Sequence, residues 1–177
     1  MTWKRTSKPY ERLYSNDMLI VSNAGPIIAL ARVGKLDLLK QFKRIYISGE
    51  AYEQVVVKGE GKPGSSEVKG SDWFITKEVK NKLAVESLTI ELEKGEAEAI
   101  ILALELNADL VLIDESIARD IAKFQGLKVI GTVGILADAY EKGVINDLKK
   151  VLDDLRSKKV WISEKVCNRV LSGIKEK

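Results

Sequence analysis

Carboxylate and amide side chains follow the short apolar segments of this sequence, and they are the residues best suited to chemistry. The candidates are Asn23 after "LIVS", Glu50, Glu53 and Gln54 after "RIYIS", Glu96 and Glu98 at the start of "GEAEAIILALEL", and Asp114 after "DLVLI". The chain has no histidine and one cysteine, Cys167, which excludes disulfides within the chain, Cys/His zinc clusters, and Ser-His or Cys-His nucleophiles. Oxygen ligands of this kind suit hard cations such as Mg²⁺ or Mn²⁺, which support phosphodiester hydrolysis.

Four apolar segments are typical of buried strands, because they are too uniformly apolar to have one face in water. They are "LIVS" (19–22), "RIYIS" (44–48), "DLVLID" (109–114) and "LKVIG" (127–131). Helical patterns separate them, at 26–40, about 49–58, 95–107 and 115–125. This alternation predicts an α/β fold with right-handed crossovers and a central parallel sheet that helices cover on both faces.

The first strand is expected at the centre of the sheet, between "RIYIS" and "DLVLI". "WFITKEV" (73–79) is a strand candidate at an edge, the Gly-, Ser- and Pro-rich segment 58–70 is typical of a solvated loop, and helices follow Gly131. In an open parallel sheet, ligands bind beyond the carboxyl ends of the strands, where helix N-termini also point. We therefore expect Asn23, Asp114 and residues among Glu50, Glu53, Gln54, Glu96 and Glu98 to face one pocket.

Composition sets the frame. A chain of 177 residues with 45% hydrophobic side chains is long enough for one domain, which we expect at 18–177, after a flexible basic extension at 1–17 that carries +2 of the net charge of +3. The charges of the remaining residues nearly balance, which argues against a dedicated high-affinity nucleic-acid surface but leaves room for a basic rim around an acidic pocket.

No stretch approaches the ~20 apolar residues of a membrane span, so we expect a cytoplasmic protein. Few glutamines beside many Lys and Glu residues are typical of heat-adapted proteins.

Each candidate also has a purely structural interpretation. Asp114 is well suited to cap the helix that follows it, and Glu96 lies in a first turn, where acidic residues complement the helix dipole. Glu98 shares a helix face with Glu105 and Asp109, which is typical of a solvated stripe.

Asn23 has a structural interpretation of its own. Pro26 fits the first position of a helix, which makes Gly25 the expected cap and Asn23 a turn residue just before it.

The C-terminal helices carry apolar residues at helical spacing: Leu148, Val151, Leu152, Leu155, Val166, Val170 and Leu171. This pattern favours packing onto the domain over an exposed groove for a partner, although both fit it.

Four stretches, in this order, resemble the PIN-domain family: "VSNAGPIIALARVGKLDLL", "GEAEAIILALEL", "ADLVLIDESIARDIAKFQGLKVIGTVGIL" and "VWISEKVCNRVLSGIKEK". The resemblance spans about Leu19 to Lys175, and the closest branch contains short prokaryotic proteins related to the ribonuclease toxins of toxin-antitoxin pairs. It implies a three-layer α/β/α fold, cleavage of RNA by acidic residues around Mg²⁺ or Mn²⁺, and, as partners, RNA, a small antitoxin protein and a second copy in a homodimer.

The resemblance places the four acidic positions of the family on Asn23, Gln54, Glu98 and Asp114. A shift of one residue would select Glu53 instead of Gln54, and Glu96 lies near the third position. Glu98 and Asp114 are then the expected metal ligands. Because the other two positions hold amides, which contribute no charge, the resemblance implies a weakened metal site.

Three functions compete. The first is a PIN-type ribonuclease that works through Glu98 and Asp114, with Asn23 and Gln54 completing the site. The second is a catalytically degenerate PIN domain that binds RNA or a protein. The third, an unrelated nucleotide-binding domain, has least support, because "GTVGIL" lacks the glycine spacing of a dinucleotide fingerprint and "GEGKPG" is no phosphate-binding loop.

Overall fold

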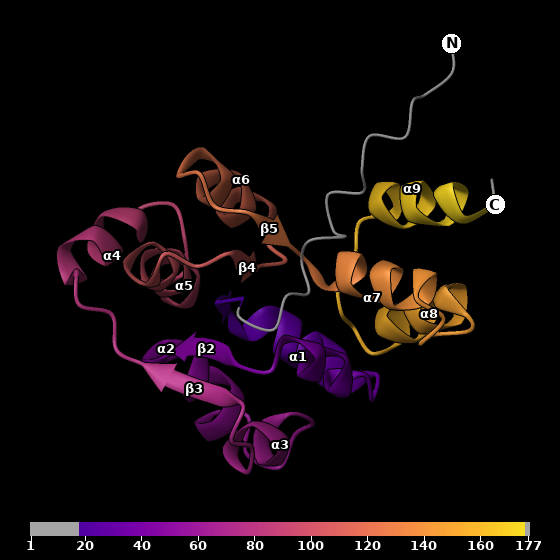
Figure 1. The fold of residues 1–177 in the computed structure, drawn as a ribbon, viewed down its shortest axis with the longest axis horizontal. Coiled ribbons are helices and arrows are strands. Elements are labelled where there is room, and N and C mark those ends of the chain that lie inside the picture. The colour runs from indigo at the N-terminus through magenta and orange to yellow at the C-terminus, as the bar shows by residue number, and fades with distance from the viewer. Residues whose placement is uncertain (1–17, 176–177) are drawn as a thin grey trace.

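The computed structural model describes residues 18–175, apart from the side chains of 174 and 175, so the predicted extension at 1–17 lies outside the described residues. Its core is a parallel sheet in the order β3-β2-β1-β4-β5 (Figure 1). The strands are β1 (Ile20–Ser22), β2 (Ile45–Ser48), β3 (Phe74–Lys77), β4 (Leu110–Leu112) and β5 (Val129–Ile130). The predicted central position of β1 and the edge position of β3 are confirmed.

Alternating side chains along the strands build two hydrophobic cores, one on each face of the sheet. In β1, Ile20 enters one core and Val21 the other, and both are fully buried. Ile20 lies in register with Ile45 of β2 and Leu110 of β4, which enter the same core. Both faces are therefore dry, as the uniformly apolar strands predicted.

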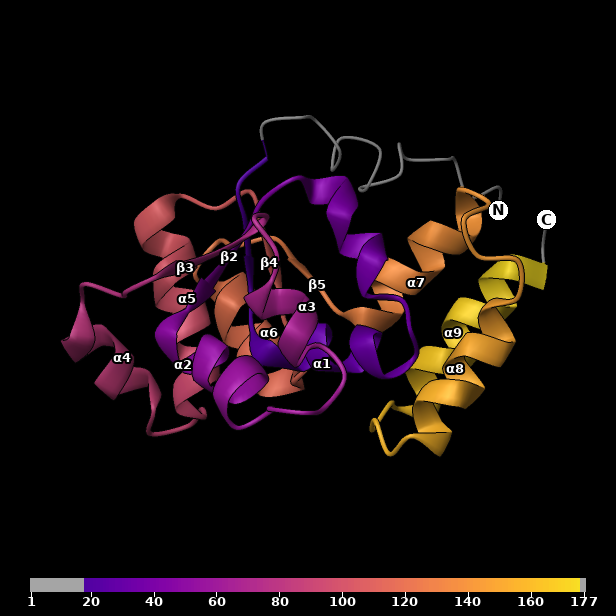
Figure 2. The same ribbon diagram turned by 90° about the horizontal axis from the view of Figure 1, so that it is seen from below.

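Helices cover both faces, which confirms the predicted three-layer α/β/α architecture (Figures 1 and 2). On one face lie α1 (Ala24–Arg32), the 3-10 helix η1 (Leu36–Phe42), α2 (Gly49–Tyr52), the π-helical turn η2 (Glu53–Val57), α3 (Ser65–Lys69), α7 (Thr132–Glu141), α8 (Leu148–Ser157) and α9 (Glu164–Lys175). On the other lie α4 (Lys82–Leu88), α5 (Lys94–Leu106) and α6 (Ser116–Phe124).

Two predicted helices are interrupted, and the predicted loop at 58–70 contains α3. The helix predicted at 26–40 ends at Arg32, because Gly34 adopts φ of 65° and the chain continues as η1. The helix predicted at 49–58 changes from α2 to the wider η2 after Tyr52.

The C-terminal helices pack onto the domain. Leu148, Val151, Leu152 and Leu155 of α8 are buried, as is Cys167 of α9, whereas Val166 is exposed. Packing thus uses most of the apolar positions that a partner groove would need. Among residues 18–175, no helix has the length and apolar character needed to cross a bilayer.

Candidate functional site

Asn23 links the end of β1 to the start of α1. Its backbone N–H donates to the Leu112 carbonyl of β4 at 3.0 Å, and its Oδ1 accepts the Ala24 N–H at 2.8 Å. The prediction that Gly25 caps this helix was wrong, because α1 begins at Ala24 and Asn23 is its cap. An asparagine satisfies the free helix donors as well as an aspartate does, so the structural role of this position does not require a carboxylate.

The side chains of Asn23 and Gln54 both approach Gly95, in the first turn of α5. A Cβ atom added at Gly95 would lie 3.2 Å from Asn23 Oδ1 and 3.0 Å from Gln54 Nε2. The Asn23 side chain, just after β1, and the Gln54 side chain of η2 therefore both approach the start of α5. The two amides that the resemblance places at acidic positions thus both lie close to Gly95.

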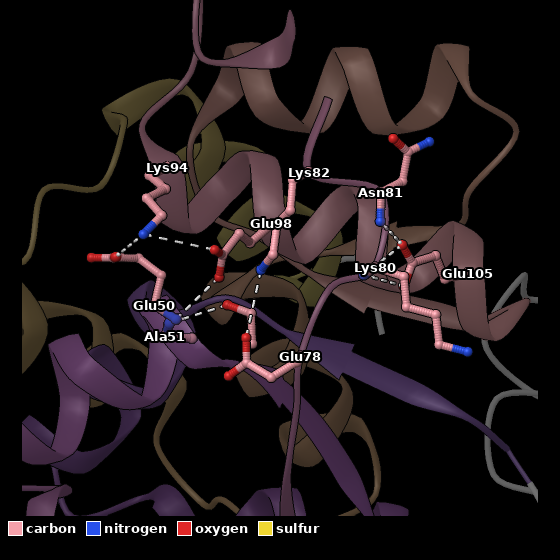
Figure 3. A network of polar contacts seen from close by, with 10 residues as sticks. Glu50, Ala51, Glu78, Lys80, Asn81, Lys82, Lys94, Glu98 and Glu105 are labelled. Carbon is pink, nitrogen blue, oxygen red and sulfur yellow. Dashed lines mark hydrogen bonds and ion pairs between the residues drawn. The ribbon is translucent and has the colours of Figure 1, made fainter. Parts of the chain in front are cut away.

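Glu98 is buried, with 5% of its surface exposed, so its assignment to a solvated stripe was wrong. Its Oε2 accepts the Glu50 N–H at 3.1 Å, and its Oε1 lies 3.9 Å from Lys94 Nζ (Figure 3). The other acids of the stripe also hold backbone donors: Glu105 accepts from Lys80 and Asn81, and Asp109 from Leu19.

Glu50 is a central residue of the site, although the family resemblance did not select it. Its two oxygens lie 3.2 Å from Lys94 Nζ and 3.7 Å from Lys58 Nζ, and Gln54 Nε2 donates to it at 3.4 Å. The hydrogen bond from Lys94 lowers the pKa of Glu50, and the same bond raises the pKa of Lys94. Glu50 and Glu98, with Lys94 between them, form what we call the ammonium cluster.

Asp114 caps a helix, but not the predicted one. The cap of α6 is Glu115, whose carboxylate accepts the Ala118 N–H at 2.7 Å. Asp114 instead receives Thr132 N–H and Thr132 Oγ1–H, both at 2.6 Å, at the start of α7. We call Asp114 with Thr132 the threonine clasp.

Solvent reaches the Asp114 side chain, yet protein atoms crowd its carboxylate. Burial raises the pKa of Asp114, while the Thr132 hydrogen bonds and the charge of Arg119 oppose that rise. Asp114 as a whole is exposed, and both of its carboxylate oxygens accept hydrogen bonds from Thr132.

Two glycines lie close to the Asp114 carboxylate. A Cβ atom at Gly25 would lie 3.8 Å from Asp114 Oδ2, and one at Gly131 would lie 2.8 Å from Asp114 Oδ1 and 2.7 Å from Arg119 Nη1. Asp114 and Asn23 therefore lie at the same edge of the sheet, on either side of the first turn of α1.

The two additional candidates contribute little to this edge. Glu96 accepts the Glu93 N–H at 3.1 Å in a capping arrangement, and burial raises its pKa. Its interpretation as a residue of the helix start fits this contact. Glu53 lies where α2 gives way to η2, and its N–H donates to backbone carbonyls of α2. Within residues 18–175, no described contact joins its carboxylate to the other candidates.

A family model, DUF3368, which describes a PIN domain, matches residues 19–176. The chain belongs to the PIN-domain family. A search of curated proteins found no match. The five-stranded parallel sheet and its helical layers are consistent with this assignment.

The donor atoms of this PIN domain do not fit a divalent metal as they are arranged. Asn23 Oδ1, both Glu98 oxygens and both Asp114 oxygens already face protein donors or an ammonium group. Mg²⁺ demands nearly octahedral oxygen ligands and loses its water reluctantly. In the described part of the chain, no three acidic or cysteine side chains are grouped so that they could hold a metal ion.

Proposed function

We propose that this PIN domain binds RNA at the carboxyl edge of its sheet and needs no divalent metal to do so. The observation that carries the proposal is the pairing of the acidic side chains of this edge with the domain's own cations. Lys94 and Lys58 lie against Glu50, and Arg119 lies beside Asp114. The family assignment supports a nucleic-acid partner.

An RNA phosphate that approaches this edge of the sheet is repelled or attracted according to the net charge of the side chains there. Bare carboxylates at this edge would repel a phosphodiester, and a nuclease offsets that repulsion with bound metal. Here side-chain cations supply the compensation, and the Lys94 and Lys58 side chains are 62% and 63% exposed. Because the two lysines are exposed, a phosphate can reach them. This favours RNA binding even when a chelator has removed divalent metal.

The test is the affinity for a fluorescent single-stranded RNA, measured by anisotropy at several salt concentrations. If Arg119 contacts a phosphate, Arg119→Ala weakens binding and lowers the slope of log affinity against log salt by about 1. Arg156→Ala, at an exposed position of α8, is the matched control and leaves both quantities unchanged. Wild-type protein that binds no RNA, or equal losses in the two variants, would contradict the proposal.

A weakened ribonuclease is the second candidate, and the closeness of Asn23 and Gln54 to Gly95 favours it. Mg²⁺ or Mn²⁺ on Glu98 and Asp114 would first have to displace Lys94 and the Thr132 donors. This candidate predicts that restored carboxylates at the two amide positions increase metal-dependent cleavage.

The double variant Asn23→Asp, Gln54→Glu separates the two candidates. If the ribonuclease candidate is correct, the variant cuts RNA faster than wild type in Mn²⁺. If the metal-free proposal is correct, the variant binds RNA more weakly in EDTA, because two negative charges are added beside the phosphate. The control variant Gln125→Glu, Asn168→Asp adds the same charge elsewhere, because Gln125 lies at the end of α6 and Asn168 lies in α9.

The antitoxin protein and the homodimer that the resemblance implies belong to the same proposal. Both stay predictions, and the apolar residues of α8, Leu148, Val151, Leu152 and Leu155, pack inside the domain.

A further inference from the structure

We propose that Lys94 is the resident cation of this site: its ammonium lies between the Glu50 and Glu98 carboxylates and keeps a divalent metal out. This role does not require that the domain bind RNA. It concerns a lysine and a glutamate, Glu50, that stand outside the four acidic positions of the family resemblance.

The two carboxylates are mostly buried, whereas the side chain of Lys94 is mostly exposed to solvent. The side chains of Glu98 and Glu50 are 6% and 15% exposed, while that of Lys94 is 62% exposed. Two negative charges that are largely shielded from water destabilise each other unless a cation offsets them. Lys94 supplies that cation at 3.2 Å from Glu50 and 3.9 Å from Glu98 (Figure 3).

Helix geometry fixes the arrangement. Lys94 and Glu98 are one turn apart on α5, and Glu50 and Gln54 are one turn apart along α2 and η2, so each pair lies on one face of its helix. Gly95 permits the close approach, because a Cβ atom there would lie 3.0 Å from Gln54 Nε2.

The charges near the cluster are balanced without a metal. Two carboxylates face the Lys94 ammonium, and Lys58 adds a second positive charge 3.7 Å from Glu50. The opposite pKa shifts of Glu50 and Lys94 fit this mutual stabilisation of their charged forms. A divalent ion entering beside Lys94 would meet two carboxylates whose charges Lys94 and Lys58 already offset, so it binds only when Lys94 leaves.

The test is direct binding of Mn²⁺, read from the loss of its free electron paramagnetic resonance signal. Lys94→Met is expected to bind Mn²⁺ at least about tenfold more tightly than wild type, because it removes the positive charge that lies between the Glu50 and Glu98 carboxylates. Lys82→Met is the matched control, since Lys82 pairs with Glu78 in the same region without contacting Glu50 or Glu98. It should leave Mn²⁺ affinity unchanged.

A second variant locates the gained site. Adding Glu98→Gln to Lys94→Met should abolish the gain, and Lys94→Arg, which keeps the charge, should show none. If Lys94→Met does not fold, Lys94→Gln provides the same comparison. Thermal unfolding gives a second measure: the neutral variant is less stable than wild type in EDTA and recovers in Mn²⁺.

Three results would overturn the proposal. They are wild-type protein that binds Mn²⁺ as tightly as the neutral variant, a folded neutral variant without a gain, and a gain that survives Glu98→Gln. Because RNA is absent from these measurements, a failure of RNA binding does not change their outcome.

Discussion

The ammonium cluster and the threonine clasp lie at the same edge of the sheet, yet they hold their carboxylates in opposite ways. In the cluster, Lys94 offsets the charges of Glu50 and Glu98. In the clasp, Thr132 gives Asp114 two short hydrogen bonds from neutral donors. The cluster is therefore stabilised by charge pairing and the clasp by hydrogen bonding.

The pKa shifts record this difference. The pKa of Glu50 is lowered, chiefly by Lys94, and that of Asp114 is raised, chiefly by burial. A carboxylate that is paired with a cation favours its ionised form in the folded protein, whereas a crowded one favours its protonated form. Replacing the acid by its amide should thus destabilise the cluster and hardly affect the clasp.

The largest expected effect comes from removing a donor of the clasp. Thr132→Val deletes the hydroxyl that donates to Asp114 at 2.6 Å, and Thr132 is 2% exposed, so water does not replace it well. We expect a loss of about 1.5 kcal/mol in the free energy of unfolding by urea at pH 7. Thr89→Val removes an exposed hydroxyl at the end of α4 and should cost less than about 0.5 kcal/mol. If the two variants lost the same free energy of unfolding, the hydrogen bond from Thr132 to Asp114 would contribute no more than an exposed one.

The cluster should respond more weakly, because its lysines are exposed and water screens them. We expect Glu50→Gln to lower the free energy of unfolding by about 0.5 to 1 kcal/mol at pH 7. Since the folded pKa is lowered, the ionised carboxylate stabilises the protein above its ordinary pKa of 4.5, and this stability is lost as the pH falls through the folded value. Urea unfolding at a series of pH values below 7 should show the difference from wild type shrinking as the pH falls through the lowered pKa of Glu50. A loss that is the same at every pH value would mean that charge pairing is not its cause.

The smallest effect is expected for Asp114→Asn, which keeps an oxygen for Thr132 N–H and offers an N–H to Thr132 Oγ1. At pH 7 we expect a change within about 0.5 kcal/mol. Because the folded pKa is raised above 3.8, wild-type protein loses stability as the pH rises through that folded value, and the amide does not. Urea unfolding from pH 3 to pH 7 should therefore show the variant gaining relative to wild type. The hydrogen-bonding account of the clasp fails if the variant becomes relatively less stable instead.

The sequence was sufficient to predict the layers, the central place of β1 between β2 and β4, and the edge place of β3. Uniformly apolar segments separated by helices require a parallel sheet with two dry faces, and the carboxyl ends of β1 and β4 then bring Asn23 and Asp114 to one edge. The family model, which matches residues 19–176, confirms the assignment to the PIN domains.

The partners of the candidate side chains could not be predicted in the same way. The spacing of Lys94 and Glu98 indicates a helical ion pair, but their contact with Glu50 depends on how α5 packs against α2. Likewise, Asp114 is one residue too early to cap α6, and only the position of β5 brings Thr132 to it. The local sequence predicts the helix or strand to which each residue belongs, whereas its contacts with other elements depend on tertiary packing.

The central claim is that the protein's own cations and donors, rather than a metal, balance the acids of this edge. The most direct measurement is the affinity of wild-type protein for one single-stranded RNA in EDTA and in Mn²⁺, at equal ionic strength, with the RNA examined on a gel afterwards. We predict affinities that agree within about twofold and an RNA that stays intact. Binding that requires Mn²⁺, or cleavage that appears with Mn²⁺ and is lost in Asp114→Asn, would contradict the claim.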